Sequence, residues 1–206
     1  MLKIRCSALG QIMTNARKKG ELSKTCQSYI KQLVKEDLFN YKSEISTKPM
    51  DKGVTMEDKS IELYNEVYTK FYVKNEERLT NDFITGECDI NAKDTIIDIK
   101  SSWSLETFPA CPMDIDSKAY EWQLRGYMML YSKPKAELAY CMVSTPLDLL
   151  SDWDNAGIHL VDKIDPVLRV TVLGFERDEA KEEEIKARVL ECREFYETYK
   201  QEILNK

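Results

Sequence analysis

Residues 84–103 read ITGECDINAKDTIIDIKSSW and contain the strongest strand signal of the chain. Two apolar runs flank a polar turn, and this pattern predicts neighbouring strands at about 82–90 and 95–101. A hairpin that turns at the central Lys-Asp pair places Asp89 directly opposite Asp98. Lys-Asp is not an ideal two-residue hairpin turn, so a shifted register stays open at this point.

Charged side chains lie where this strand pair needs core residues. Residues two apart in a strand share a face, so Asp98 and Lys100 lie together, and Ile97 and Ile99 lie on the opposite face. A buried ion pair would explain an isolated Asp-x-Lys, although such pairs add little net stability. Asp89 changes the balance, because two buried carboxylates that face each other need a shared proton or a cation.

Two predicted helices direct further polar side chains towards the sheet. On a helix at about 53–72, Glu57 extends an apolar stripe, although capping or a local ion pair would also explain its place. That stripe consists of Ile61, Tyr64, Tyr68 and Phe71. On a helix at about 117–131, Gln123 and Tyr127 are one turn apart and share a face. An interior glutamine needs hydrogen-bond partners, so Gln123 joins the candidate site.

The residue types favour one class of metal. The chain has a single histidine, His159, which disfavours a Ser-His-Asp triad and a histidine-rich zinc site. Its six cysteines are scattered without a C-x-x-C motif, so we expect reduced and mostly buried thiols. Three carboxylates and a lysine fit oxygen-ligated Mg²⁺ or Mn²⁺, and such ions suit phosphodiester hydrolysis.

Length and charge set the organisation of the chain. Its 206 residues suit one domain, which we divide into a basic helical segment at 1–50, a catalytic core at 51–145 and a C-terminal strand and helix at 146–206. Residues 1–50 carry a net charge of +6 and the remainder −12. A basic segment on an acidic body suits a localised phosphate-binding face, although a solvated lysine-rich surface explains it equally well.

The remaining elements complete a mixed sheet between helices. The apolar periodicity predicts helices at about 7–17, 23–38 and 147–154, a helix from about 178, and strands at about 136–143 and 168–176. This order indicates an α/β (α+β) fold with a central mixed sheet flanked by helices. No apolar run is long enough to span a membrane and no signal peptide is evident, so we expect a cytoplasmic protein.

Glu57, the ECDI and IIDIKSSW segments and the YEWQLRGYM helix together resemble the PD-(D/E)xK nuclease superfamily. Their order and spacing from about Ser7 to Tyr131 are similar to those of its lambda-type phage exonuclease and YqaJ-like viral recombinase branch. An Asp-x-Lys alone is a weak motif, whereas four elements in sequence are specific. Cys88 stands where the proline of the motif is expected, and proline supplies no chemistry there.

The resemblance implies a restriction-endonuclease-like core and assigns roles to individual residues. It implies that Glu57, Asp89 and Asp98, with the backbone carbonyl of Ile99, hold two Mg²⁺ or Mn²⁺ ions, and that Lys100 is the catalytic lysine. Gln123 and Tyr127 would lie near the metal and the DNA. Substrate contacts are expected from Tyr127, Ser101, Arg5 and Ser7.

The same resemblance implies a function and its partners. We expect an exonuclease that degrades duplex DNA from its ends in the 5′→3′ direction for phage-type recombination, in the cytoplasm of the host cell. A single-strand annealing protein and a ring-shaped homotrimer are the implied partners. An endonuclease or nickase on the same fold remains an alternative, as does an inactive DNA-binding module. A third alternative, the iron–sulfur nuclease of the superfamily, needs a cysteine cluster that this chain lacks.

Overall fold

A computed structural model describes residues 1–18, 20–43 and 46–206. Its centre is a four-stranded sheet in the order β4-β5-β6-β7. The strands span Ile90–Asn91, Thr95–Ser101, Lys135–Cys141 and Val170–Glu176. β5 and β6 run parallel, whereas β4 and β7 are antiparallel to their neighbours, so the sheet is mixed, as predicted.

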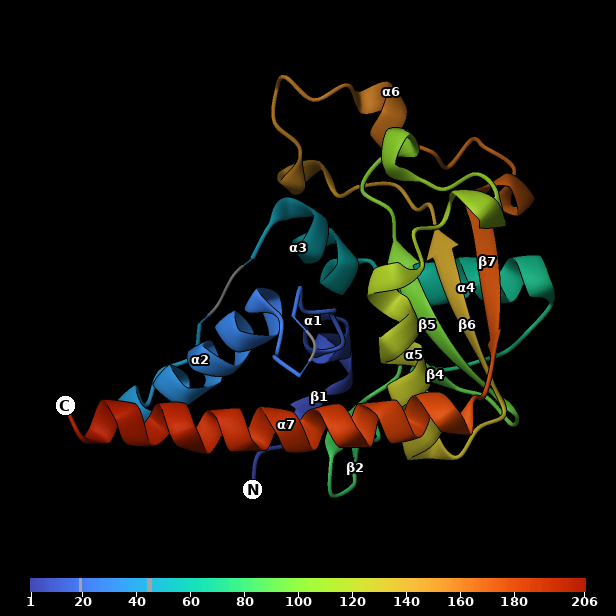
Figure 1. The fold of residues 1–206 in the computed structure, drawn as a ribbon. Helices are drawn as coiled ribbons and strands as arrows, with labels where there is room; N and C mark the ends of the chain where they lie inside the picture. Colours follow the sequence, from blue (N-terminus) through green and yellow to red (C-terminus); the bar gives the residue numbers. More distant parts are fainter. Residues whose placement is uncertain (19, 44–45) are drawn as a thin grey trace.

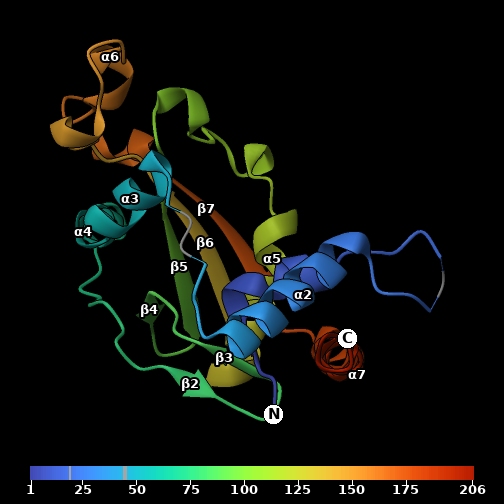
Figure 2. The same cartoon turned by 90° about the vertical axis from the view of Figure 1, so that its left-hand side faces the viewer.

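Helices cover both faces of this sheet. Figure 2 shows α4 (Glu57–Tyr68) on one side of the strands and α5 (Lys118–Tyr131) on the other. Ile97 and Ile99 belong to the apolar cluster that includes the buried side chains of α4, and Ile96 belongs to the cluster that includes those of α5. The alternation predicted for β5 is therefore confirmed, and it turns Asp98 towards α5.

The first predicted strand, at 82–90, is divided between two sheets. Its start forms β3 (Ile84–Gly86), which pairs in parallel with β1 (Ile4–Arg5) and antiparallel with β2 (Leu79–Thr80). Its end forms β4 in the central sheet. The prediction of one continuous strand was wrong because β1, a partner about 80 residues earlier in the chain, pairs with only its first half.

The helix predicted at 23–38 is confirmed as α2 (Lys24–Phe39), capped by Ser23, whereas the other helices of the N-terminal half are shorter than predicted. A 3₁₀ turn and α1 end at Ile12, so the helix predicted to Arg17 stops early. These elements are η1 (Cys6–Ala8), α1 (Leu9–Ile12), α2 (Lys24–Phe39) and α3 (Lys48–Thr55). The predicted helix at 53–72 is two helices, α3 and α4, separated at Met56. Pro49 lies in the first turn of α3, where its missing N–H costs nothing, and Phe71 lies outside the helix and is 93% exposed.

A buried lysine attaches α3 to the sheet. Lys52 is fully buried, and its ammonium donates to the carbonyls of Ser102, Trp103 and Val143 at 2.6, 3.1 and 2.7 Å. Burial lowers the pKa of Lys52 to about 8, while the three acceptors favour the charged form. These bonds tie α3 to the chain immediately after β5 and β6.

The C-terminal third closes the fold. β7 is followed by α7 (Glu179–Leu204), which lies along α2 in Figure 1 and brings Cys192 within 3.5 Å of Cys26. The region between β6 and β7 contains η4, α6 and η5 instead of one helix at 147–154, and two 3₁₀ turns precede α5. Their bounds are Leu147–Leu149, Ala156–His159, Pro166–Arg169, Leu105–Thr107 and Pro112–Asp114.

All six cysteines are free thiols, and five of them are buried, as expected. Within residues 1–18, 20–43 and 46–206, none of the helices combines the length and the apolar character that crossing a membrane requires.

Candidate active site

Asp98 is the centre of the candidate site. It lies on β5, it is 0% exposed, and its Oδ1 accepts a hydrogen bond of 2.7 Å from Nε2 of Gln123 on α5. Its Oδ2 is buried and accepts no well-directed hydrogen bond from any described residue, although Nζ of Lys100 lies 2.6 Å away. One oxygen of this carboxylate is thus fixed by a neutral amide and the other faces a charge.

Lys100 lies between the carboxylates and an aromatic ring. Its ammonium is 5.2 Å from the centroid of the Tyr120 ring, an arrangement that suits a cation–π contact. Burial disfavours the charged form, but Asp98 and Asp89 outweigh it and raise the pKa of Lys100 above its ordinary value. The lysine is therefore a cation held against the acidic cluster.

Asp89 lies immediately before β4. The pairs Ile90–Ile97 and Asn91–Ile96 agree with a turn between residues 93 and 94, and continuing that register brings Asp89 opposite Asp98. Asp89 Oδ2 accepts a 2.6 Å hydrogen bond from the backbone N–H of Ile99 in place of a strand carbonyl. Burial and then the charge of Asp98 raise the pKa of Asp89 to about 7, so the second carboxylate of this pair ionises only at a cost.

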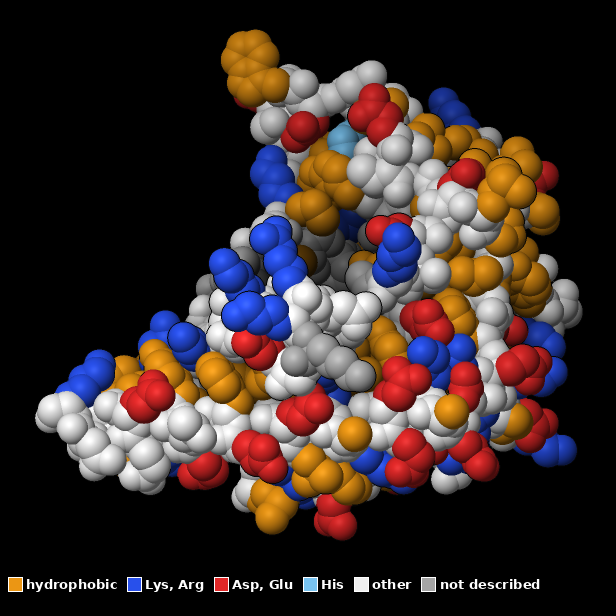
Figure 3. Space-filling model, viewed as in Figure 1, with side chains coloured by type: hydrophobic (Ala, Val, Ile, Leu, Met, Phe, Trp, Pro, Cys, Tyr) orange, Lys and Arg blue, Asp and Glu red, His pale blue; other side chains and the backbone are white. Residues whose placement is uncertain are grey.

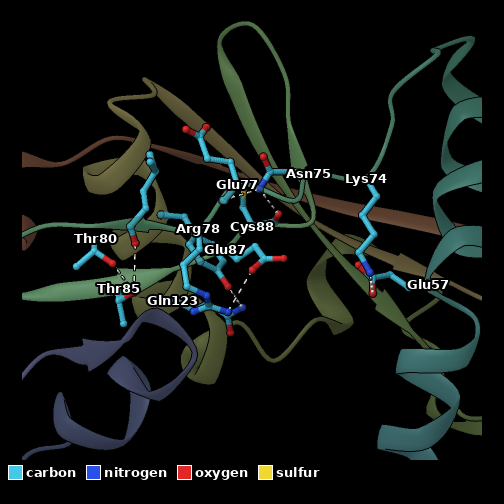
Figure 4. A network of polar contacts seen from close by, with 12 residues as sticks. Glu57, Lys74, Asn75, Glu77, Arg78, Thr80, Thr85, Glu87, Cys88 and Gln123 are labelled. Atoms are coloured by element: carbon cyan, nitrogen blue, oxygen red, sulfur yellow. Dashed lines mark hydrogen bonds and ion pairs between the residues drawn. The ribbon is translucent and has the colours of Figure 1, made fainter.

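Glu57, the third predicted ligand, is the first residue of α4 and is turned towards another cation. Nζ of Lys74 lies 2.7 Å from Glu57 Oε2, and this bond raises the pKa of Lys74. Figure 4 shows the two side chains pointing toward each other. Glu57 nevertheless acts electrostatically on Asp89. In the described part of the chain, no three histidine, cysteine or acidic residues converge closely enough to hold a metal ion as they stand.

The segment that carries Lys74 runs beside Asp89. The backbone N–H of Asn75 donates to the carbonyl of Asp89 at 2.8 Å, and the Asn75 side chain donates to the carbonyls of Cys88 and Glu77 at 3.0 Å each (Figure 4). Glu87, two residues before Asp89, pairs instead with Arg78 at 3.2 Å. Asp89 and not Glu87 therefore lies against β5.

The predicted substrate-binding residues have different surroundings. Tyr127 is buried, and its hydroxyl accepts a 3.2 Å hydrogen bond from Gln123, so it supports the glutamine. Ser101 turns to the α4 side, where its hydroxyl lies 2.7 Å from that of Ser60. Arg5 and Ser7 are exposed, and no hydrogen bond or ion pair among the described residues joins them to the carboxylates.

The residues present fit an oxygen-ligated divalent cation. Glu57, Asp89 and Asp98 supply only carboxylate oxygens, which Mg²⁺ and Mn²⁺ prefer. Asp98 Oδ2 has the Lys100 ammonium 2.6 Å away but no well-directed hydrogen bond from the described residues, so it keeps acceptor capacity for a metal ion. Burial, with a further contribution from the charge of Asp98, raises the pKa of Asp89, and a divalent cation nearby would favour the ionised form of this carboxylate.

Lys74 and Asn75 lie beside the site, although neither could be predicted from the sequence. Both lie in the run FYVKNEER, which has no helical or strand periodicity, so no pattern indicated that they approach the site. Their places depend on the chain path after α4, where the Asn65 side chain bonds both the N–H and the carbonyl of Tyr72. A short-range signal for that path is absent from the sequence.

Comparisons with known proteins place the fold among solved structures. A phage-related exonuclease from Haemophilus somnus 129PT superposes with a TM-score of 0.92 and 32% sequence identity, over 98% of this chain and 96% of that one. The alkaline exonuclease LHK-Exo from Laribacter hongkongensis superposes with a TM-score of 0.71 and 15% identity, over 98% of this chain and 92% of that one. Its complex with dAMP gives a TM-score of 0.69 and 17% identity, over 98% and 91% of the two chains. No protein-family model and no curated protein sequence matches the chain.

Proposed function

This chain belongs to the lambda-type phage exonuclease branch of the PD-(D/E)xK nuclease superfamily, and we propose that it hydrolyses duplex DNA from its ends with Mg²⁺ or Mn²⁺. The observation that carries the proposal is the buried Asp98 carboxylate, held by Gln123 and Lys100 and placed next to Asp89. That arrangement supports the metal-dependent nuclease chemistry that the family implies.

In this proposal Asp89, Asp98 and Glu57, with the carbonyl of Ile99, hold two divalent ions. When bound, the ions would polarise the scissile phosphate and supply hydroxide at neutral pH. Gln123 fixes the orientation of Asp98, and Asp89 is fixed by the N–H of Ile99. Lys100 orients the attacking water and offsets the negative charge that develops on the phosphate.

The proposed substrate is DNA, and several features favour it. LHK-Exo, which shares the fold, has been solved with dAMP. The face shown in Figure 3 has a hollow with lysine and arginine side chains along its rim, a setting that suits a phosphate backbone. We propose that Arg5 and Ser7, which are exposed, contact the DNA end. For Ser101 and Tyr127 the observed hydrogen bonds favour supporting roles behind the site.

Direction and assembly rest on family resemblance. We propose 5′→3′ resection in phage-type recombination, with a single-strand annealing protein that covers the strand left behind. A ring-shaped homotrimer would enclose the duplex and keep the enzyme on its substrate.

The test uses end-labelled linear duplex and closed circular duplex, each with Mg²⁺ or with EDTA. We expect nucleotides to be released from the linear duplex with Mg²⁺ only, and the label at each end reports the direction. Cleavage of the closed circle would show an endonuclease. No release from the linear duplex at any Mg²⁺ or Mn²⁺ concentration would indicate an inactive DNA-binding module.

Single substitutions then test the site. We predict that Asp98→Asn and Lys100→Met each lower the turnover rate by at least about 100-fold, because each removes charge that the transition state needs. Matched controls are Asp94→Asn and Lys93→Met, which change exposed residues in the turn between β4 and β5. Circular dichroism and urea unfolding report whether the fold is retained. Normal turnover in Asp98→Asn and Lys100→Met would refute the assignment.

A further inference from the structure

A cation supplied by the chain itself lies on one carboxylate of the candidate metal site. Nζ of Lys74 is 2.7 Å from Oε2 of Glu57, and Figure 4 shows the lysine side chain reaching down to the start of α4. Asp58 and Asp89 act on the same ammonium electrostatically. Lys74 therefore lies in the field of the acidic residues on this side of the site.

The backbone around Lys74 is fixed, whereas its side chain is not enclosed. At Tyr72, two residues before Lys74, the backbone carbonyl accepts a hydrogen bond of 2.8 Å from the Asn65 side chain, and the backbone N–H donates to that side chain at 3.0 Å. One residue after Lys74, the N–H of Asn75 donates to the carbonyl of Asp89 at 2.8 Å. The Lys74 side chain is 43% exposed, so its ammonium can leave Glu57 for solvent without any change in the backbone.

A carboxylate oxygen cannot keep a short contact with an ammonium and bind a divalent ion in the same place. The two cations would also repel each other, and more strongly where solvent is excluded. Where Oε2 is the ligand, Glu57 must exchange one cation for the other, and an ion bound through Oε1 alone would still meet the repulsion of the nearby ammonium.

We propose that Lys74 is an internal counter-cation for Glu57, which neutralises this carboxylate in the metal-free protein and is displaced when a divalent ion binds there. The inference rests on the proposed function, since it takes Glu57 as a ligand. Lys74 is then a positioning residue that sets the affinity of the site for its metal. It holds Glu57 away from Asp89 and Asp98 until the ion supplies a stronger partner.

The direction in which metal affinity changes on removal of Lys74 distinguishes a competing counter-cation from the other roles that this lysine could have. An ion pair of partly exposed residues with no other role contributes little, and its loss would leave metal affinity unchanged. A lysine that holds Glu57 ready for the metal would weaken metal binding when removed. A competing counter-cation would strengthen metal binding when removed, because its displacement no longer opposes the ion.

The experiment measures Mn²⁺ binding to the full chain without DNA, by isothermal titration calorimetry and by the electron paramagnetic resonance signal of free Mn²⁺. We expect Lys74→Gln to bind Mn²⁺ about fivefold more tightly than the wild type. Lys74→Arg keeps the charge and should stay within about twofold. Lys70→Gln removes the same charge four residues earlier and is the matched control, also expected within about twofold.

Unchanged or weaker Mn²⁺ binding by Lys74→Gln would overturn the inference, and so would equal tightening by Lys70→Gln, which would reflect net charge alone. These outcomes leave the proposed nuclease chemistry standing. Absence of Mn²⁺ binding in the wild type is the different result that overturns the proposed metal chemistry, and this inference with it.

Discussion

Gln123 organises Asp98 without neutralising it. Its Nε2 donates one hydrogen to Asp98 Oδ1, at a nitrogen–oxygen distance of 2.7 Å, and the other to the Tyr127 hydroxyl, at 3.2 Å. A lysine or arginine in its place would hold the carboxylate equally well but would oppose a metal ion. A neutral amide fixes the orientation of Asp98 and leaves its full charge for a cation.

We predict that Gln123→Met lowers both stability and activity. The substitution leaves Asp98 Oδ1 buried without a donor, which should reduce the free energy of unfolding by about 1–3 kcal/mol. Loss of a side chain that orients a ligand should lower the turnover rate by about 10- to 100-fold. Urea unfolding and initial rates on labelled duplex measure the two effects.

Tyr127→Phe is the graded comparison for that substitution. It removes only the hydroxyl at 3.2 Å from Gln123 and keeps the buried ring, so its effect on the rate should stay below about tenfold. Wild-type stability and turnover in Gln123→Met would show that the hydrogen bond to Asp98 is dispensable.

At the scale of elements, α5 brings Gln123 to the sheet by lying unusually close to the N-terminal turn. A Cβ at Gly126 would be 2.5 Å from Leu9 Cδ1 and 3.0 Å from Cys6 Sγ. At Gly86 on β3 a Cβ would be 2.7 Å from Cys6 Sγ and 2.8 Å from Tyr127 Cε1. Glycine at both places lets η1, β3 and α5 meet around Cys6, and this contact sets the depth of α5 over β5.

We predict that Gly126→Ala destabilises the protein although alanine is the better helix former. The gain in helix propensity is about 1 kcal/mol, whereas overpacking of a filled core costs about 1–3 kcal/mol. Because a displaced α5 also moves Gln123, turnover should fall as well. Urea unfolding of the variant, with rates measured under native conditions, gives both quantities.

Gly53→Ala is the matched control for the packing argument. Gly53 lies inside α3, and a Cβ added there would meet no neighbouring group of the described residues within 4 Å. Alanine at this position should therefore stabilise the protein by about 0.5–1 kcal/mol. Equal stabilisation by both substitutions would mean that the close approach at Gly126 does not constrain α5.

Elements with strong internal periodicity could be predicted from the sequence, and those that depend on distant partners could not. The alternation of Asp98 with Ile97 and Ile99 is local, so it identified both faces of β5 correctly. The division of residues 82–90 depends on β1, and the Glu57–Lys74 pair joins residues 17 positions apart through an irregular segment. The spacing of residues along the chain therefore predicts neither the strand pairing with β1 nor the Glu57–Lys74 ion pair.

At the scale of the whole molecule, the basic N-terminal segment is built into the fold. Ile4, Leu9 and Ile30 are buried in the same apolar cluster as Leu124 of α5 and Val189 of α7. The basic side chains of β1 and α2 are therefore carried by anchored elements of an otherwise acidic protein. A net charge of −6 would repel DNA as a whole, so binding must depend on where the basic residues lie.

We predict that the salt dependence of DNA binding reports this placement. Arg17 and Lys24 line a cavity of about 540 Å³ together with Thr14 and Thr25, and each of the two basic side chains is expected to contact a phosphate. Each contact contributes about 0.9 to the slope of log affinity against log salt concentration. Arg17→Gln combined with Lys24→Gln should therefore reduce that slope by up to about 2, measured by fluorescence anisotropy with EDTA to prevent cleavage.

The control removes two positive charges elsewhere, because net charge alone would affect both variants alike. Lys135 pairs with Glu176 at 3.7 Å and Lys186 with Glu183 at 2.6 Å, so Lys135→Gln combined with Lys186→Gln makes the same change of charge outside the N-terminal segment. An unchanged slope in this control beside a reduced slope in the Arg17/Lys24 variant locates the phosphate contacts on the N-terminal segment. Equal slopes in the two variants would mean that the basic segment has no special part in binding DNA.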